Sequence, residues 1–224
     1  ELLEFVRISI INNDKKTLTY LNANSFNLIK EKSEINKVFS KFDLIHADGL
    51  GIYLASKFLY RRNGLRERIT GSDFYVKLIQ EGIKNSWSFY FLGDKEETLN
   101  KISNTNPELI IRGFSEGYDF VTENILKTIT QLKPDILIVG LGSPKQEEWI
   151  IENKNNIHSK VIFAVGDGIK IFAGTKKRGP TIFQKIGLEW FIRFLYEPKR
   201  LWKRYIVGIP LFILRVLKYK LFKQ

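Results

Sequence analysis

The sequence predicts an α/β fold of Rossmann-like type, in which a largely parallel sheet is flanked by helices and is followed by a helical, basic C-terminal appendage. Three observations predict it. Short apolar runs alternate with stretches of helical spacing, glycine turns follow several of these runs, and the net positive charge gathers near the C-terminus. A chain of 224 residues is long enough for one substantial core and an appendage. We therefore expect an α/β catalytic core over residues 1–180 and a helical appendage over 181–224.

The predicted strands are short runs of aliphatic, β-branched or aromatic residues, bounded by polar residues or glycine. Runs of this kind fit strands that are buried on both faces of a parallel sheet. They are Phe5–Ile11, Leu44–Ala47, Ser88–Leu92, Leu109–Arg112, Ile136–Gly140 and Val161–Val165.

The predicted helices lie between these strands, where apolar residues recur every three or four positions. Strand and helix thus alternate, and in such folds ligands bind at the carboxyl ends of the strands. The helices are Ser25–Phe39, Leu50–Leu59, Asp73–Lys84, Lys95–Ser103, Thr122–Leu132 and Pro144–Asn153.

The C-terminal segment differs from the rest in charge. From Lys170 onward the chain holds 14 Lys and Arg against two Glu, which accounts for the whole net charge of +12. Helical spacing runs from Ile182 to Tyr196, and Pro198 and Pro210 are expected to divide the remainder into the helices Lys199–Ile209 and Leu211–Phe222.

Aromatic residues interleave with Lys and Arg throughout this tail. Its longest uncharged stretch, Tyr205–Leu214, is far shorter than the roughly 20 residues needed to cross a bilayer. A cationic, aromatic amphipathic segment favours an anionic membrane surface. An ordinary basic face packed on the core and a nucleic-acid interface stay open as alternatives.

Composition excludes several kinds of chemistry. The chain has no cysteine, so disulfides, thiolate catalysis and cysteine-bound metals are excluded, and a reducing cytosol fits. The two histidines are far apart, no Asp-x-Asp occurs, and no metal or cofactor is expected. Because the chain lacks methionine and begins at Glu1, we expect the native start to precede this sequence; the visible N-terminus shows no targeting segment.

Three glycine turns at predicted strand ends indicate a nucleotide site. They contain Gly93, the pair Gly140 and Gly142, and Gly166. Glycine lets the backbone approach a ligand, and a following helix offers free N–H groups to a phosphate. Lys145 and Gln146 stand in the first turn of the helix after Gly142, where they could contact phosphate or base.

Two carboxylates open predicted helices. Asp48 directly follows the strand Leu44–Ala47, a position that suits either a general base or a helix cap. Asp73 stands in the segment Thr70-Gly71-Ser72-Asp73, where local pattern favours capping. His46 is expected to pack at a strand end.

Eight segments, in this order and spacing, resemble the WecG/TagA/CpsF glycosyltransferases of bacterial surface-polysaccharide and teichoic-acid synthesis. The resemblance runs from about residue 5 to about residue 210. The segments are Asn22–Phe26, Ala47–Gly49, Arg68–Asp73, Phe91–Gly93, Gly140–Glu147, Lys177–Pro180, Gly187–Trp190 and Glu197–Tyr205.

This resemblance implies a GT-E type α/β fold and an inverting, metal-independent hexosyltransferase. The implied donor is a UDP-sugar carrying N-acetylmannosamine or a related sugar, and the implied acceptor is linked to polyprenyl diphosphate. The implied location is the cytoplasmic face of a bacterial plasma membrane, bound peripherally through the appendage. Nucleic acid is not an expected partner, and a homo-oligomer stays open.

Matching motifs imply a role for individual residues. Asp48 resembles the family's catalytic base, and Gln146 a nucleotide-contacting glutamine. Arg200 and Arg204 resemble appendage arginines that meet a diphosphate. The remaining matches belong to the substrate pocket and are Asn22, Arg68, Thr70, Gly71 and Asp73.

Two positions depart from the family pattern. Tyr20 stands where a threonine is often found, and Lys170 stands where an aspartate associated with the nucleobase is usual. Two other functions fit the residues less well. A nucleotide-dependent oxidoreductase lacks the third glycine of GxGxxG, because position 145 is lysine, and a non-enzymatic basic module leaves the Asp48 and Thr70–Asp73 turns without a purpose.

Overall fold

The computed structural model describes residues 1–176, 179–180, 183–184 and 187–222. The chain separates into two compact units. Unit 1 consists of Glu1–Tyr20, Glu34–His46 and Gly71–Lys176, and unit 2 of Leu21–Ser33, Ala47–Thr70 and the described part of Lys177–Gln224.

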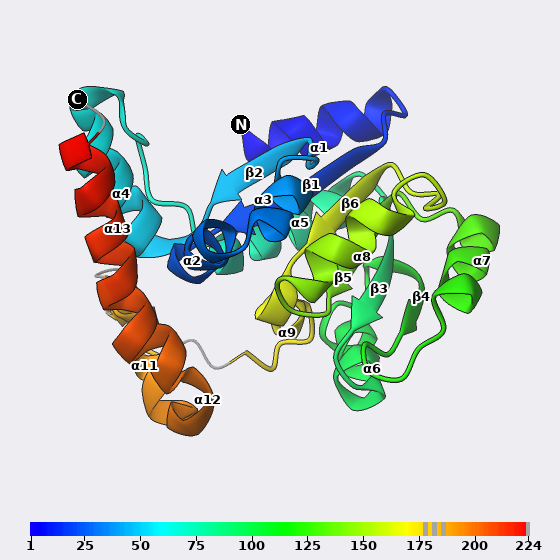
Figure 1. The fold of residues 1–224 in the computed structure, drawn as a ribbon. Helices are drawn as coiled ribbons and strands as arrows, with labels where there is room; N and C mark the ends of the chain where they lie inside the picture. Colours follow the sequence, from blue (N-terminus) through cyan, green and yellow to red (C-terminus); the bar gives the residue numbers. More distant parts are fainter. Residues whose placement is uncertain (177–178, 181–182, 185–186, 223–224) are drawn as a thin grey trace. The chain divides into compact units, whose positions relative to one another are not determined.

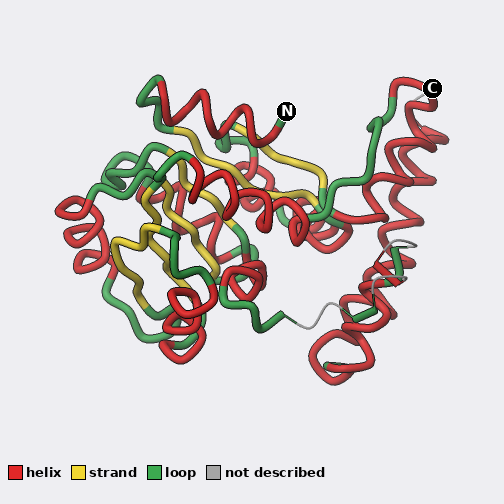
Figure 2. The backbone as a smooth tube through the Cα atoms, turned by 180° about the vertical axis from the view of Figure 1, so that it is seen from behind, coloured by secondary structure: helices red, strands yellow, loops and turns green. Residues whose placement is uncertain are grey.

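Unit 1 is built on a sheet, to which unit 2 contributes only the last residue of β1 and of β2. Within the described residues the sheet has six strands in the order β2-β1-β6-β5-β3-β4, and neighbours run parallel from β1 across to β4. Figure 2 shows the strands as a layer between helices. The α/β, Rossmann-like fold class is therefore confirmed. The strands are β1 Lys16–Leu21, β2 Leu44–Ala47, β3 Ser88–Gly93, β4 Ile110–Ser115, β5 Ile136–Gly140 and β6 Val161–Ala164.

Helices cover both faces of this sheet. Alternate residues of β3 show the period of two: Phe89 and Phe91 point into one core, and Tyr90 and Leu92 into the other. The first core is closed by α1, α5, α6 and α9, the second by α3, α7 and α8. The bounds are α1 Leu2–Ile11, α3 Ser33–Phe39, α5 Gly71–Lys84, α6 Glu96–Thr105, α7 Thr122–Leu132, α8 Lys145–Asn153, the 3₁₀ turn η2 Gly166–Gly168 and α9 Ile169–Phe172.

The N-terminal segment corrects one sequence prediction. The expected strand Phe5–Ile11 lies within helix α1, and the first strand is β1. Val6, Ser9 and Ile10 are the buried residues of α1, and their spacing of three and one places them on one helical face. The β-branched composition of this segment resembled a strand, but its burial has helical periodicity.

Unit 2 is helical, and its described tail packs on two earlier segments of the chain. Phe212 and Val216 of α13 are buried with Ile52 of α4, and α13 lies beside α4 (Figure 1). Arg215 donates from Nη1 to the backbone O of Asn27 at 3.0 Å and to its Oδ1 at 2.9 Å. The elements are α2 Ala23–Glu31, α4 Gly49–Tyr60, the 3₁₀ turn η1 Arg61–Asn63, α11 Glu189–Tyr196, α12 Pro198–Trp202, the π-helical segment η3 Lys203–Val207 and α13 Gly208–Phe222.

Two further helix predictions need correction. The predicted helix Ser25–Phe39 is two helices, α2 and α3, because Lys32 between them has an extended backbone. Pro210 does not separate two helices: it lies in the first turn of α13, where a proline removes little helical bonding, and the π-helical segment η3 precedes it. The start of the predicted helix at Ile182, and Lys177 and Arg178 of one family motif, lie outside the described residues.

The two units differ strongly in charge. Unit 1 has 17 Lys and Arg against 19 Asp and Glu, a net charge of −2, whereas unit 2 has 19 against 5, a net charge of +14. The positive charge is therefore not confined to the tail. Residues 47–70 bring five Lys and Arg to the same unit.

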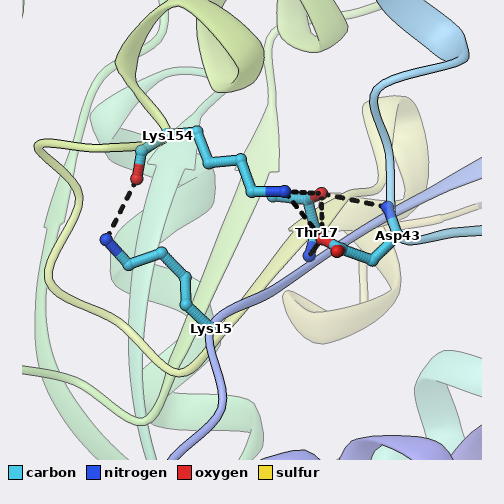
Figure 3. A network of polar contacts seen from close by, with 4 residues as sticks. All are labelled: Lys15, Thr17, Asp43 and Lys154. Carbon is cyan, nitrogen blue, oxygen red and sulfur yellow. Dashed lines mark hydrogen bonds and ion pairs between the residues drawn. The ribbon is translucent and has the colours of Figure 1, made fainter.

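At the amino end of β1 a carboxylate ties the strand to its neighbours (Figure 3). Asp43 Oδ2 accepts from the backbone N and Oγ1 of Thr17, each at 2.7 Å, and from Lys154 Nζ at 2.9 Å. Burial alone would raise the pKa of Asp43, but the hydrogen bonds from Lys154 and Thr17 outweigh it and hold the pKa below its usual value. Asp135 makes the same pair of bonds to Ser88 at the start of β3.

Candidate functional site

The carboxyl ends of β3 and β5 form the topological switch point of the sheet in unit 1. The chain leaves β3 toward β4 on one side and leaves β5 toward β6 on the other. Ligands of open α/β sheets bind where two neighbouring connections part in this way. A Cβ on Gly93, the last residue of β3, would lie 2.7 Å from the backbone C and O of Gly140, the last residue of β5. Only glycine allows the two strand ends to come so close.

The loop after β5 presents its backbone openly. Gly142 has φ +81°, and a Cβ placed there would meet nothing within 4 Å. Gln146 N donates to Gly142 O at 2.9 Å and so begins α8. The side chain of Lys145 lies with Nζ 5.4 Å from the centre of the Phe120 ring.

A buried polar network follows at the start of α8. Gln146 and Glu147 are both fully buried. Gln146 Oε1 accepts from Gly166 N at 2.8 Å, Gln146 Nε2 donates to Glu147 Oε1 at 2.8 Å, and Thr19 Oγ1 donates to the same oxygen at 2.9 Å. The network joins the ends of β1 and β6 to α8.

Burial raises the pKa of the Glu147 carboxyl, although the hydrogen bonds from Gln146 and Thr19 act in the opposite direction. The side chain of Gln146 is fully engaged between Gly166 and Glu147. In this arrangement it shapes the glycine turn after β6. Sequence reasoning singled out Gln146 but missed Glu147 and Thr19, because a charged residue at a buried helical position has no distinct local signature.

A cluster of opposite charges lies next to this edge of unit 1. Lys170 Nζ lies 3.9 Å from Asp94 Oδ2 and 3.5 Å from Asp167 Oδ1. Lys176 Nζ lies 3.4 Å from Asp167 Oδ2. Lys170, the departure noted from the sequence, thus forms ion pairs with carboxylates from two strand-end turns. His46, as expected, is buried at the end of β2 among aromatic rings.

Unit 2 brings Asn22 and Asp48 together. Asn22 caps α2, since its Oδ1 accepts from the backbone N of Asn24 at 3.0 Å and of Ser25 at 3.1 Å. Its Nδ2 donates to Asp48 Oδ2 at 3.4 Å. Asp48 stands at the N-cap position of α4, yet its side chain makes no capping hydrogen bond there. Of the two interpretations left open by the sequence, capping is therefore not what the Asp48 carboxylate does in this structure.

Arg68 belongs to the same unit. Its Nη2 donates to the backbone O of Gln184 at 2.7 Å, and a Cβ on Gly187 would lie 2.7 Å from its Nη1. Arg68 therefore bonds to Gln184 and packs close to Gly187, two described residues ahead of α11. Thr70 ends this part of unit 2, while Gly71 and Asp73 begin α5 in unit 1.

The two appendage arginines lie near the start of the tail helices. Arg200 is exposed and forms an ion pair with Glu197, the N-cap residue of α12. The guanidinium of Arg204 lies 5.8 Å from the centre of the Tyr205 ring. Both guanidinium groups are positively charged, which suits binding to a diphosphate.

In the part of the chain that the structure describes, no three His, Asp or Glu side chains gather closely enough to hold a metal ion. Within those same residues, no helix is long and apolar enough to cross a membrane.

Comparison with known proteins places these observations in a family. The model of the glycosyl transferase WecG/TagA/CpsF family matches residues 1–224. A relative from Staphylococcus aureus strain MRSA252 is 30% identical over 226 aligned positions, which cover 98% of this chain and 87% of the relative. A relative from strain NCTC 8325 is 29% identical with the same coverage.

Both relatives carry the name N-acetylglucosaminyldiphosphoundecaprenol N-acetyl-beta-D-mannosaminyltransferase. The match does not favour the oxidoreductase or the non-enzymatic module considered from the sequence. Because the family model spans the whole chain, this protein belongs to the WecG/TagA/CpsF family of glycosyltransferases.

Proposed function

We propose that this glycosyltransferase moves N-acetylmannosamine, or a closely related sugar, from a UDP-sugar to an N-acetylglucosamine linked through diphosphate to a polyprenol. The observation that carries the proposal is the shared name of relatives that match 98% of the chain. Its support in the structure is a carboxylate, Asp48, that stands at a helix start without capping the helix.

Asp48 is assigned the role of general base. Its carboxylate takes the proton from the acceptor hydroxyl while that oxygen attacks the anomeric carbon of the donor. The bond from this carbon to the diphosphate breaks as the new glycosidic bond forms, so UDP leaves and the configuration is inverted. Asn22, which donates to Asp48 Oδ2, orients the base and keeps one of its oxygens in place.

The nucleotide is assigned to the glycine turns of unit 1. Gly93, Gly140, Gly142 and Gly166 stand at the strand ends, and a Cβ on Gly142 would meet nothing within 4 Å. Backbone N–H groups of this open loop can donate to a diphosphate. Lys145 stands in the first turn of α8. Gln146 contributes by shaping the turn at Gly166.

The remaining roles are assigned by family motif and by charge. Arg200 and Arg204 neutralise negative charge that develops on the leaving diphosphate or that the lipid carries. Arg68, Thr70, Gly71 and Asp73 belong to the substrate pocket.

The tail is assigned to an anionic membrane surface on the cytoplasmic face. Trp202, Ile206 and Leu214 are exposed in a tail that is rich in Lys and Arg, and unit 2 carries a net charge of +14. Exposed aromatic and aliphatic side chains next to cations suit the headgroup region of a bilayer.

A panel of UDP-sugars tests the proposal. The full chain is incubated with each donor and with a synthetic polyprenyl-diphosphate N-acetylglucosamine, and the lipid product is identified by mass. We expect product with UDP-N-acetylmannosamine or a close relative, and none from Asp48→Asn. Transfer from Asp48→Asn at the wild-type rate would remove Asp48 as the base, and the absence of product with every donor would overturn the proposal.

A further inference from the structure

We infer that unit 2 has a second membrane-contacting element besides its tail, formed by the exposed side of α4 and the arginine loop that follows it. We call this element the α4 patch and define it by Leu54, Phe58, Arg61, Arg62 and Arg66. It rests on the proposed function, since it needs an enzyme that works at an anionic lipid surface.

The apolar part of the α4 patch is a pair of large side chains one helical turn apart. Leu54 is 53% exposed and Phe58 is 48% exposed. Positions four apart lie on the same side of a helix. The opposite side of α4 is buried, because Ile52 packs in the core of unit 2 with Phe212 and Val216 of α13.

The charged part follows directly in the chain. Arg61, Arg62 and Arg66 are exposed, and none of them forms an ion pair within the described residues. The only acidic residue between positions 49 and 72 is Glu67, so the excess of positive charge is not neutralised locally. Three exposed guanidinium groups thus follow two exposed apolar side chains within 13 positions of the chain.

The loop that carries the arginines is held firmly against α4. Leu65 N donates to Ser56 Oγ at 2.9 Å, and the Leu65 side chain packs against the core of unit 2. A Cβ on Gly64 would lie 2.7 Å from Ser56 O, so glycine is needed for this close return. The guanidinium groups are therefore presented from a fixed backbone, which lowers the entropy lost on binding.

These features favour a lipid surface over a nucleic acid. A phosphate backbone would use the arginines but would leave Leu54 and Phe58 in water. A bilayer with anionic headgroups uses both, since the guanidinium groups meet lipid phosphates while the apolar side chains enter the acyl boundary. The tail of unit 2 likewise combines exposed apolar side chains with Lys and Arg, and unit 2 as a whole has a net charge of +14.

Site-specific fluorescence tests this inference directly. Because the chain has no cysteine, Phe58→Cys gives a single labelling site for an environment-sensitive NBD dye. Vesicles of phosphatidylcholine with 30% phosphatidylglycerol should shift the emission to the blue, and doxyl-labelled lipid should quench it. Val121→Cys is the matched control, because Val121 is 56% exposed but lies in unit 1. The emission of a dye at position 121 should change little when vesicles are added.

Charge removal provides a second, independent test. The triple variant Arg61→Ser, Arg62→Ser, Arg66→Ser should partition at least tenfold more weakly into the same vesicles, since each cation near such a surface contributes about fivefold. The control triple Lys77→Ser, Lys84→Ser, Lys127→Ser removes the same charge from exposed positions of unit 1. Circular dichroism and the melting temperature check that both variants are folded.

The outcomes separate this inference from the proposed function. One contrary result is that wild-type protein binds the vesicles while the emission of the dye at position 58 does not change. Another is that both triple variants lose vesicle binding equally. Either result would show that the α4 patch does not contact the membrane and that the tail alone docks. If wild-type protein binds no vesicle at all, membrane docking itself fails, and the α4 patch fails with it. Sugar transfer to a detergent-dispersed acceptor is measured in parallel and reports on catalysis alone.

Discussion

Replacing Glu147 with alanine probes the buried network that joins α8 to the strand ends of unit 1. Glu147 Oε1 accepts one hydrogen bond from Thr19 Oγ1 at 2.9 Å and one from Gln146 Nε2 at 2.8 Å. All of this lies in the interior, where Glu147 and Gln146 are fully buried. In Glu147→Ala both donors lose their acceptor and water cannot readily replace it.

The expected loss of stability follows from the number of buried hydrogen-bond donors that are left without an acceptor. A buried donor left without a partner costs about 1–3 kcal/mol, so two give about 2–6 kcal/mol. For a chain of this size each kcal/mol lowers the melting temperature by about 2–4 °C. We therefore expect Glu147→Ala to melt about 4–24 °C below the wild type, as measured by circular dichroism.

Glu147→Gln is the matched control, because its Oε1 can still accept both hydrogen bonds while the charge is absent. Burial raises the pKa of Glu147 in the folded state, so the unfolded chain gives up this proton at lower pH. As pH rises from the ordinary value near 4.3 toward and past the folded value, ionisation therefore costs stability in the wild type only. Stability of Glu147→Gln relative to wild type should increase over this window.

Two results would refute this reasoning. A melting temperature of Glu147→Ala within about 1 °C of wild type would show that the network adds nothing to stability. A stability difference between Glu147→Gln and wild type that is flat from pH 4 to pH 8 would show that the carboxyl does not titrate with a raised pKa.

Three other changes have defined outcomes. Asp48→Asn should reduce sugar transfer at least 100-fold while donor affinity by calorimetry changes less than threefold, because general-base catalysis contributes about 10²–10⁴-fold. Asp43→Ala should lose about 1–3 kcal/mol at neutral pH in urea unfolding; since the folded pKa of Asp43 is lowered, this loss should shrink as pH falls below about 4 toward the folded pKa. Gly93→Ala should lose at least about 1–3 kcal/mol, because its φ is +143° and its Cβ would meet the β5 backbone at 2.7 Å.

Controls make these three outcomes specific. Equal weakening of donor binding and transfer by Asp48→Asn would assign Asp48 to binding instead. A loss in Asp43→Ala that stays constant down to pH 2.5 would contradict the lowered pKa. Gly51→Ala is the matched control for Gly93→Ala, since a Cβ there meets its neighbours at an ordinary 3.5 Å, and equal losses in the two would contradict the close approach at the switch point.

The sequence predicted most of the sheet because fully buried parallel strands are continuous apolar runs. It missed β1, whose two threonines are fully buried in spite of their polarity. Thr17 and Thr19 are buried because their hydroxyls bond to Asp43 and Glu147, which lie 26 and 128 positions away. No local sequence pattern indicates hydrogen-bond partners that lie so far away in the chain.

The candidate site shows the same limit. Glycine turns at strand ends and the position of Asp48 were visible in the chain, because turns and strand ends have local signatures. The hydrogen bond from Asn22 to Asp48 joins positions 26 apart, and the ion pair of Lys170 with Asp94 joins positions 76 apart. The assignment of residues 21–33 and 47–70 to the same compact unit as the tail likewise depends on contacts such as that of Arg215 with Asn27.

The discontinuous make-up of unit 2 has a consequence for its synthesis. Residues 21–33 and 47–70 leave the ribosome early, but Phe212 and Val216, which share their apolar core, are made roughly 140 residues later. At about 5–20 residues per second, the nascent chain keeps that surface uncovered for roughly 7–30 s. The apolar core of unit 2 is therefore completed only after the segment with Phe212 and Val216 has been made, and the early segments alone cannot bury that surface.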